Sequence, residues 1–263
     1  MIQQAMMWAV AWSWWWAAPV DFHTKAVDMD GSTEYMANTT DQSIWIADSV
    51  SGSIWFNPDA WAVTRYLLSC ANWTDNVSRF FVYIRDVDTV RVVRYSSNWT
   101  TVSRRTWSNT TVTEWSINHF AFTYSSNSLD VFVNWTKQTT FSEDSVTSTS
   151  ATDSNRSVVL GSVASWLWSS LFPWQFSSCS LWNIKLWDSA VTDIYDSWDW
   201  YKLDMRDTHW SNYTSTETAA LKHQWALWKN VSPDIWEDFV SSWWINVETN
   251  AANITDADIV TFT

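Results

Sequence analysis

The sequence predicts an all-β protein whose short antiparallel strands form a sandwich or a barrel. Runs rich in Val, Ile, Phe, Tyr and Thr recur about every 8–12 residues, separated by polar, turn-forming segments. Two of these runs alternate: Phe120 and Phe122 share one face of residues 117–124, and Val131 and Val133 share one face of the next run. Helical patterns are confined to the last third of the chain.

Seven runs have the composition of strands. They are residues 49–56, 79–85, 89–95, 100–105, 117–124, 129–133 and 157–161. Residues 142–155 are rich in Ser, Thr, Asn and Asp, and we expect a loop there. No internal repeat is evident, so the strands are expected to build one sandwich rather than a repeat array.

Two helices are predicted after the last strand. A short one is expected over residues 188–195. A longer one is expected over residues 214–227, because Thr214 and Glu217 have the spacing of a capping box and apolar residues follow at helical spacing.

The chain has 263 residues, enough for one large domain with its own core. Its 15 Lys and Arg and 28 Asp and Glu give a formal net charge of −13. Nucleic acid is therefore excluded as an expected partner, since phosphate binding needs clustered basic residues. Cys70 and Cys179 have no metal-ligand spacing, and both a disulfide and two buried thiols stay open.

Residues 1–20 resemble the apolar part of a signal peptide, ending in small residues. They lack the basic segment that such signals carry, and they are too short and serine-interrupted for a membrane span. We expect a flexible N-terminal tail here and no membrane span, with a signal or anchor as the alternative.

Tryptophan and glycine occur in inverted proportions: 26 Trp and 3 Gly, where a chain of this length usually has about 18 Gly. Asn72-Trp73, Asn98-Trp99 and Asn134-Trp135 each separate strand-like runs, where Asn-Gly would form a hairpin turn with positive φ. We hypothesise that many Trp are glycines encoded by a codon, such as UGA, that the source reads as glycine. The alternative is a Trp-rich protein with aromatic ligand platforms.

Other aromatic residues lie in apolar, periodic runs. We predict that they belong to the hydrophobic core. They are Trp55, Trp115, Phe120, Phe122 and Trp187.

Three segments resemble the motifs of a known family. Residues 27–36 (VDMDGSTEYM) look like its opening strand and turn. Residues 115–124 (WSINHFAFTY) with 129–136 (LDVFVNWT) look like its central hairpin, and residues 181–194 look like its closing strand and short helix. Together they resemble the laminin-G-like, or concanavalin A-like, lectin/glucanase domain, which implies a two-sheet antiparallel jelly roll.

The resemblance implies three parts: a tail over 1–20, a jelly-roll domain over 21–200, and a C-terminal extension with one helix over 201–263. Residues 225–228 and 245–260 of the extension look like those of laminin-G-like proteins in tailed bacteriophages and prophages. This likeness implies a structural protein of a phage particle, located on a virion or outside the cell.

Catalytic motifs are not evident. Glycosidases of this fold use two carboxylates on one strand, and no such pattern occurs. There is also no spacing typical of a Ser-His-Asp triad or of a zinc site. No cofactor is required, but many jelly rolls of this kind hold calcium through loop oxygens. The resemblance therefore makes Asp86, Asp88, Asp144 and Asp153 candidate calcium ligands.

These observations predict a non-enzymatic binding or structural module that recognises a glycan or a virion or cell-surface protein. The alternative is a glycoside hydrolase of the same fold. A homo-oligomer is compatible with either function.

Overall fold

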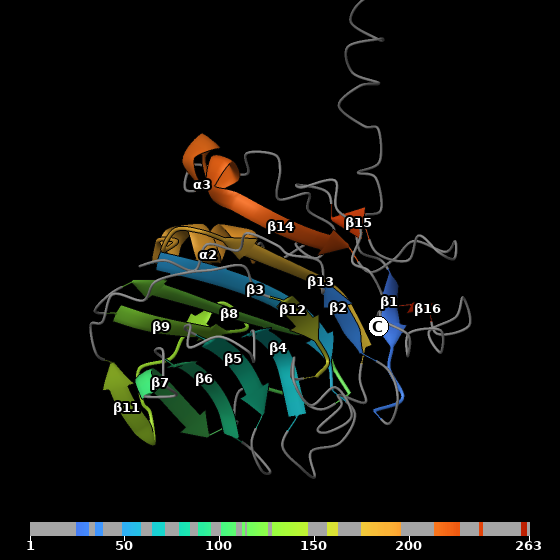
Figure 1. The fold of residues 1–263 in the computed structure, drawn as a ribbon, viewed down its shortest axis with the longest axis horizontal. Helices are drawn as coiled ribbons and strands as arrows, with labels where there is room; N and C mark the ends of the chain where they lie inside the picture. The colour runs from blue at the N-terminus through green and yellow to red at the C-terminus, as the bar shows by residue number, and fades with distance from the viewer. Residues whose placement is uncertain are drawn as a thin grey trace, which may run out of the picture.

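The protein is described by a computed structural model, in which two antiparallel sheets stack as a sandwich (Figure 1). The structure describes residues 25–31, 35–38, 49–58, 65–71, 79–84, 89–95, 101–108, 112–113, 115–125, 128–146, 157–162, 175–195, 213–226, 237–238 and 259–261.

Sheet A, as far as the chain is described, has nine strands. Seven follow the order β10-β9-β8-β3-β13-β1-β16, and β14 pairs with both β13 and β15. Their bounds are β1 Lys25–Asp28, β3 Ser49–Asn57, β8 Asn118–Ser125, β9 Ser128–Val133, β10 Thr136–Lys137, β13 Gln175–Trp182, β14 Leu221–Ala226, β15 Glu237–Asp238 and β16 Ile259–Thr261.

Sheet B has seven strands in the described ranges, in the order β11-β7-β6-β5-β4-β12-β2. Their bounds are β2 Met36–Asn38, β4 Arg65–Ala71, β5 Arg79–Ile84, β6 Thr89–Tyr95, β7 Thr101–Ser108, β11 Glu143–Val146 and β12 Ser157–Leu160. Each neighbouring pair is antiparallel.

The core fills the space between the sheets. Alternation along each strand turns one set of apolar side chains inward, and the inward sets of both sheets form one buried cluster. Phe80 of sheet B and Phe122 of sheet A meet there with ring centroids 4.3 Å apart. Cys70 and Cys179 lie in the same cluster as buried thiols that are not joined by a disulfide.

Each of the seven predicted runs contains a strand: β3, β5, β6, β7, β8, β9 and β12. The pattern gave no separate strand over Arg65–Ala71, and the loop expected over 142–155 contains β11. The strand Glu143–Val146 reads as polar, but its acidic residues pair with arginines of sheet B. Such pairs across strands cannot be seen in local composition.

The helix predicted over residues 214–227 is wrong beyond its first turns. Helix α3 spans Ser215–Ala220, and its capping box between Thr214 and Glu217 is present as predicted. Leu221–Ala226 instead forms β14 along β13. Tertiary pairing thus overrides helix propensity in this segment.

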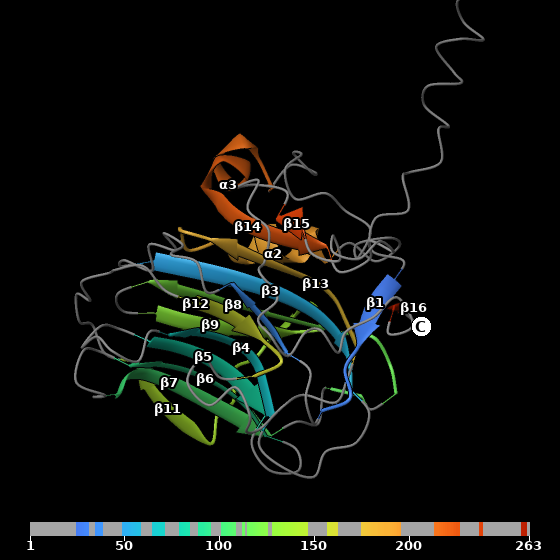
Figure 2. The same cartoon turned by 45° about the vertical axis from the view of Figure 1, so that its right-hand side comes forward.

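Helix α2 lies beside β13 and β14 of sheet A, and α3 leads directly into β14 at the edge of that sheet (Figures 1 and 2). Helix α2, Asp188–Ile194, agrees with the prediction. Ala190, Val191 and Ile194 of this helix pack with Trp182 and Leu221 in a second apolar cluster. The strands β14 and β16 of the C-terminal segment hydrogen-bond to β13 and β1, so this segment completes sheet A. No helix within the described ranges has the length and apolarity to cross a membrane.

Gly52 marks a close approach within sheet A. A Cβ atom at this position would lie 2.6 Å from Cζ of Phe122 and 3.0 Å from Cδ2 of Leu181. Both neighbours are buried in the core and have little room to move. We expect Gly52→Ala to lower the free energy of unfolding by about 1–3 kcal/mol, measured by urea denaturation. In the double variant Gly52→Ala/Phe122→Leu, the free energy of unfolding should fall by less than the sum of the two single losses, because the smaller side chain at 122 relieves the clash. Fully additive losses would contradict the steric explanation.

Candidate functional site

Each sheet has an outer face, which we define as the face turned away from the other sheet. The outer face of sheet A is unusually polar for a buried surface. Its buried polar residues are Ser51, Ser53, His119, Thr123, Asp130, Ser178 and Ser180. Their partners therefore decide whether this face is a site or a structural interface.

Ser51 fixes the segment that follows β13 to the outer face of sheet A. Its hydroxyl donates to the carbonyl of Ile184 at 2.8 Å and accepts from the backbone N–H of Leu186 at 2.9 Å. Leu186 is buried in the apolar cluster beneath α2. The segment is thus held at a defined position, and α2 begins directly after it.

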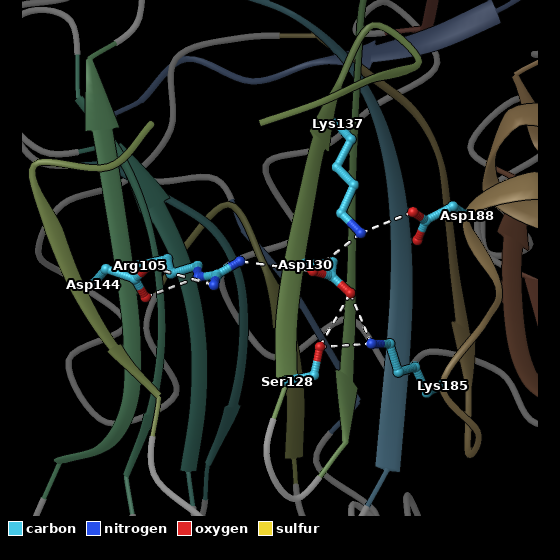
Figure 3. Close-up of polar contacts among 7 residues, drawn as sticks. All are labelled: Arg105, Ser128, Asp130, Lys137, Asp144, Lys185 and Asp188. Carbon is cyan, nitrogen blue, oxygen red and sulfur yellow. Dashed lines mark hydrogen bonds and ion pairs between the residues drawn. The ribbon is translucent and has the colours of Figure 1, made fainter. Parts of the chain in front are cut away.

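Asp130 of β9 is the centre of a charged cluster at the edge of the sandwich (Figure 3). Its side chain is 12% exposed and contacts three cations. Lys185 Nζ lies 2.7 Å away, Lys137 Nζ 3.3 Å and Arg105 Nη1 3.6 Å. Because Arg105 comes from β7 of sheet B and Lys185 from the segment below α2, the carboxylate connects both sheets with the helix segment.

Two further carboxylates, Asp188 and Asp144, pair with cations of this cluster. Lys137 also contacts Asp188 at 2.8 Å, and Arg105 contacts Asp144 at 3.0 Å. Burial alone would raise the pKa of Asp130, but the hydrogen bond from Lys185 and the charges of Lys185 and Lys137 outweigh it and lower that pKa. A carboxyl group held ionised in this way is unsuited to act as a general acid, whose pKa must be raised. We conclude that this cluster is structural.

His119 forms a second buried group on the outer face of sheet A. Its ring stacks on Trp55 with centroids 3.9 Å apart, and its Nε2 lies 2.7 Å from the hydroxyl of Ser53. Burial lowers the pKa of His119 to about 3, so the ring is neutral at physiological pH. Because the Ser53–His119 pair is fully enclosed, its geometry fits a core hydrogen bond rather than a nucleophile and base open to substrate.

The outer face of sheet B carries a row of aromatic and charged side chains. Tyr66 lies beside Tyr83, with ring centroids 5.0 Å apart. Arg91 donates from Nη1 to the Tyr83 hydroxyl at 3.2 Å and from Nη2 to Glu143 Oε2 at 2.6 Å. Tyr83 and Arg91 are buried, while Tyr66 and Glu143 are partly exposed. Aromatic rings beside oriented polar groups are typical of ligand-binding surfaces. This row is the candidate site.

Asp144 is the one candidate calcium ligand that lies within the described residues. Asp144 directs both carboxylate oxygens toward Arg105, at 3.0 and 3.4 Å, which is a guanidinium pair rather than a cation cage. Asp86, Asp88 and Asp153 lie outside the described residues. In the described part of the chain, no group of three or more His, Cys, Asp or Glu side chains is arranged to hold a metal.

Three of the five predicted core aromatics, Trp55, Phe120 and Phe122, are buried. Trp115 and Trp187 are corrections, because they are 69% and 74% exposed. Trp187 is the N-cap of α2, and its neighbour Leu186 takes the buried position instead. The backbone N–H of Trp115 bonds to the Pro58 carbonyl in a turn before β8, with the side chain outward.

The backbone torsion φ distinguishes Trp115 and Trp135 from the other described tryptophans. Among the described non-glycine residues, positive φ occurs at Trp115 (58°), Asn134 (45°) and Trp135 (63°). Asn134-Trp135 joins β9 to β10 as a two-residue hairpin turn, as the sequence predicts. The other Asn-Trp pairs, at 72–73 and 98–99, lie outside the described residues.

The sheet order, the core and the helices define an all-β protein, a two-sheet antiparallel jelly-roll sandwich with small helices toward its C-terminus. No protein-family model matches the sequence, and no curated protein matches it.

Solved structures share the fold. A heptameric SAP-like pentraxin from Limulus polyphemus is 14% identical, with a TM-score of 0.53 over 67% of this chain and 84% of the pentraxin. The sialidase module CBM40 of Ruminococcus gnavus, bound to α2,3-sialyllactose, is 14% identical, with a TM-score of 0.52 over 66% and 98%. A putative carbohydrate binding protein from Bacteroides ovatus is 14% identical, with a TM-score of 0.52 over 80% of this chain and 52% of that protein.

Proposed function

We propose that this chain is a non-enzymatic module that binds carbohydrate. The observation that carries the proposal is the shared jelly-roll architecture: the R. gnavus module holds a sialylated sugar on this fold, and the B. ovatus protein is described as a putative carbohydrate binding protein. The aromatic and charged row on sheet B supplies suitable chemistry in this chain.

Binding is favoured over hydrolysis by the placement of acidic residues. Hydrolysis on this fold needs two carboxylates flanking the same bond. In the strands of sheet B, as far as they are described, the acidic residues are Glu143 and Asp144. As neighbours on one strand they face opposite sides of the sheet, and each is ion-paired with an arginine.

A glycan array tests this proposal. The protein should bind at least one glycan class, and it should do so with and without added calcium if the loop aspartates have no role. Release of reducing sugar from the bound glycan would instead support a hydrolase. Absence of binding to every glycan would overturn the carbohydrate proposal and leave recognition of a partner protein.

We also propose that the module is displayed on a virion or secreted outside the cell, where it contacts a glycan or a virion or cell-surface protein. The likeness of the C-terminal segment to extensions of phage proteins supports this context. Mass spectrometry of purified particles and of the culture supernatant should detect the chain in one of these fractions. Light scattering of the purified protein will show whether it forms a homo-oligomer.

The torsions at residues 115 and 135 support our third proposal, that many Trp are glycines in the source organism. A non-glycine residue in the left-handed region costs about 1–2 kcal/mol, and both side chains are exposed and add no core packing. We expect Trp115→Gly and Trp135→Gly each to raise the free energy of unfolding by about 1 kcal/mol, measured by urea denaturation.

Two kinds of tryptophan serve as controls. Trp187 is also exposed but has a φ of −73°, so Trp187→Gly should bring no gain. Trp55 and Trp182 are buried, and their replacement by glycine should cost at least about 3 kcal/mol. The coding DNA and the intact mass of natively expressed protein test the codon directly. A mass that matches 26 Trp would refute recoding.

A further inference from the structure

The two cysteines of the chain come from opposite sheets into the same apolar core. Cys70 lies in β4 of sheet B, and Cys179 lies in β13 of sheet A. Both side chains are fully buried. They are far apart in the sequence, so only the stacking of the two sheets brings them into one cluster.

The strand orders place both cysteines in the same region of this core. The Arg105–Asp130 ion pair joins β7 to β9, and the contact between the Phe80 and Phe122 rings joins β5 to β8. The two sheets are therefore stacked with their strands in the same order. Beyond the aromatic contact, β4 is the next strand of sheet B, and β3 and β13 are the next two of sheet A. Both cysteines thus lie on the same side of that contact.

The register places the cysteines at similar heights along their strands. Cys70 lies opposite Phe80 in the neighbouring strand, and the Phe80 ring contacts Phe122. Phe122 lies in one row across sheet A with Leu181 of β13. Cys179 is two positions from Leu181 and faces the same side of β13. Each cysteine is therefore within one or two side chains of this row.

The acid–base behaviour of Cys179 is a further sign that the two thiols are neighbours. Burial raises the pKa of this thiol well above its ordinary value, and the charge of an ionised Cys70 raises that pKa further. The repulsion between two charges weakens with the distance between them, so it shifts a pKa only when the groups are close.

We infer that Cys70 and Cys179 are a redox pair that is oxidised to a disulfide linking the two sheets of the sandwich. The structure describes the reduced form, with two thiols. In the oxidised form one Sγ–Sγ bond replaces two S–H bonds. A small-molecule disulfide such as oxidised glutathione is the oxidant: its S–S bond breaks, and its two sulfurs take up the two electrons and both protons as two thiols. Immunoglobulin domains show that a disulfide can join the sheets of a β-sandwich.

Burial determines when this bond can form. Attack on a disulfide requires a thiolate, and the raised pKa of Cys179 leaves almost no thiolate in the folded protein at neutral pH. We therefore expect the bond to form while the chain folds. An oxidising compartment would give the linked form, whereas a reducing cytosol would keep the two thiols. The link does not depend on whether the chain binds carbohydrate.

The test follows both thiols during refolding. The full chain is unfolded in urea and refolded in two buffers, one with dithiothreitol and one with a mixture of reduced and oxidised glutathione. Each sample is then unfolded again and treated with N-ethylmaleimide, which labels thiols but not disulfides. Intact mass gives the number of labels, and peptide mapping without reductant identifies the linked residues. Cys70→Ala and Cys179→Ala are the controls, because each lacks one partner.

We expect two labels on the chain refolded with dithiothreitol and none on the chain refolded with glutathione. The latter should be about 2 Da lighter than the reduced, unlabelled chain, and Cys70 should be linked to Cys179 within one chain. The midpoint of urea denaturation should rise by about 1 M in the linked form, because the bond closes a long loop in the unfolded chain. Each alanine variant should have the same midpoint in both buffers.

Two labels after refolding with glutathione would overturn this inference, and so would disulfides formed only between copies or with glutathione. The labelling uses the parent chain, so it decides the question even if a substitution in the core prevents folding. A glycan array has no influence on the result, since the disulfide and the proposed carbohydrate binding are measured separately.

Discussion

Replacing Asp130 with asparagine should lower the free energy of unfolding by about 2–3 kcal/mol at neutral pH. The substitution keeps the shape of the side chain but removes the negative charge that Lys185, Lys137 and Arg105 share. Removing one partner of a buried ion pair typically costs about 3–5 kcal/mol. The expected value is smaller here because the three cations are 19–37% exposed and are partly screened by solvent.

The measurement is urea denaturation of Asp130→Asn beside Asp188→Asn. Asp188 is 54% exposed and contacts Lys137 alone among the cations of the cluster in Figure 3, so its variant should lose at most about 1 kcal/mol. High salt should reduce the difference in free energy of unfolding between Asp130→Asn and the parent, since it screens the repulsion among the three cations. If Asp130→Asn and Asp188→Asn lower the free energy of unfolding equally, the charge of Asp130 contributes no more to stability than that of the exposed Asp188.

A double variant tests the cause of the loss. Lys185→Met removes the nearest cation and keeps much of its apolar stem. When it is combined with Asp130→Asn, the total loss should be smaller than the sum of the two single losses, because the carboxylate and the ammonium act as a pair. Additive losses would indicate that Asp130 acts through packing.

Local signals in the sequence predicted local structure well. Asn134-Trp135 forms the hairpin turn that its dipeptide suggests, and Thr214 and Glu217 form the expected capping box. Both depend on contacts within a few residues. The alternation around Phe120 and Phe122 likewise identified a strand and its inward face.

Features that depend on register could not be predicted in the same way. Arg105, Asp130 and Lys185 are brought together only when β7, β9 and the segment after β13 take their places. The row from Tyr66 to Glu143 likewise exists only through the order of sheet B. The apolar neighbours of Trp115 predict a core position, but its backbone torsion and the hydrogen bond from its N–H to the Pro58 carbonyl turn the side chain outward.

Stability should also fall in weak acid because of His119. In the folded protein burial lowers the pKa of His119 to about 3, whereas an unfolded chain has a histidine pKa of about 6.5. Between these values the unfolded state binds a proton that the folded state cannot accept. The His119 contribution is therefore fully present above about pH 6.5 and is lost as the pH falls, by about 1.4 kcal/mol per pH unit.

Urea denaturation at pH 7.5, 6.5, 5.5 and 4.5 measures this slope. This range lies above the pKa to which Asp130 is lowered, so the ion cluster contributes little to the change. Between pH 6.5 and 4.5 the parent should lose about 2–3 kcal/mol more than His119→Gln, which cannot take up the proton. Equal slopes in both proteins would mean that His119 titrates normally when folded.

Proton NMR gives a second and independent measurement. The His119 ring, enclosed by Trp55 and Ser53, should show no titration shift between pH 7.5 and 4.5 while the protein stays folded. A titration midpoint near 6.5 would contradict the buried, neutral ring. Because the ring contacts both Trp55 of β3 and Tyr195 at the C-terminal end of α2, a charge on it would weaken the packing of Tyr195 against Trp55. Acid should therefore loosen the outer face of sheet A before the core between the sheets.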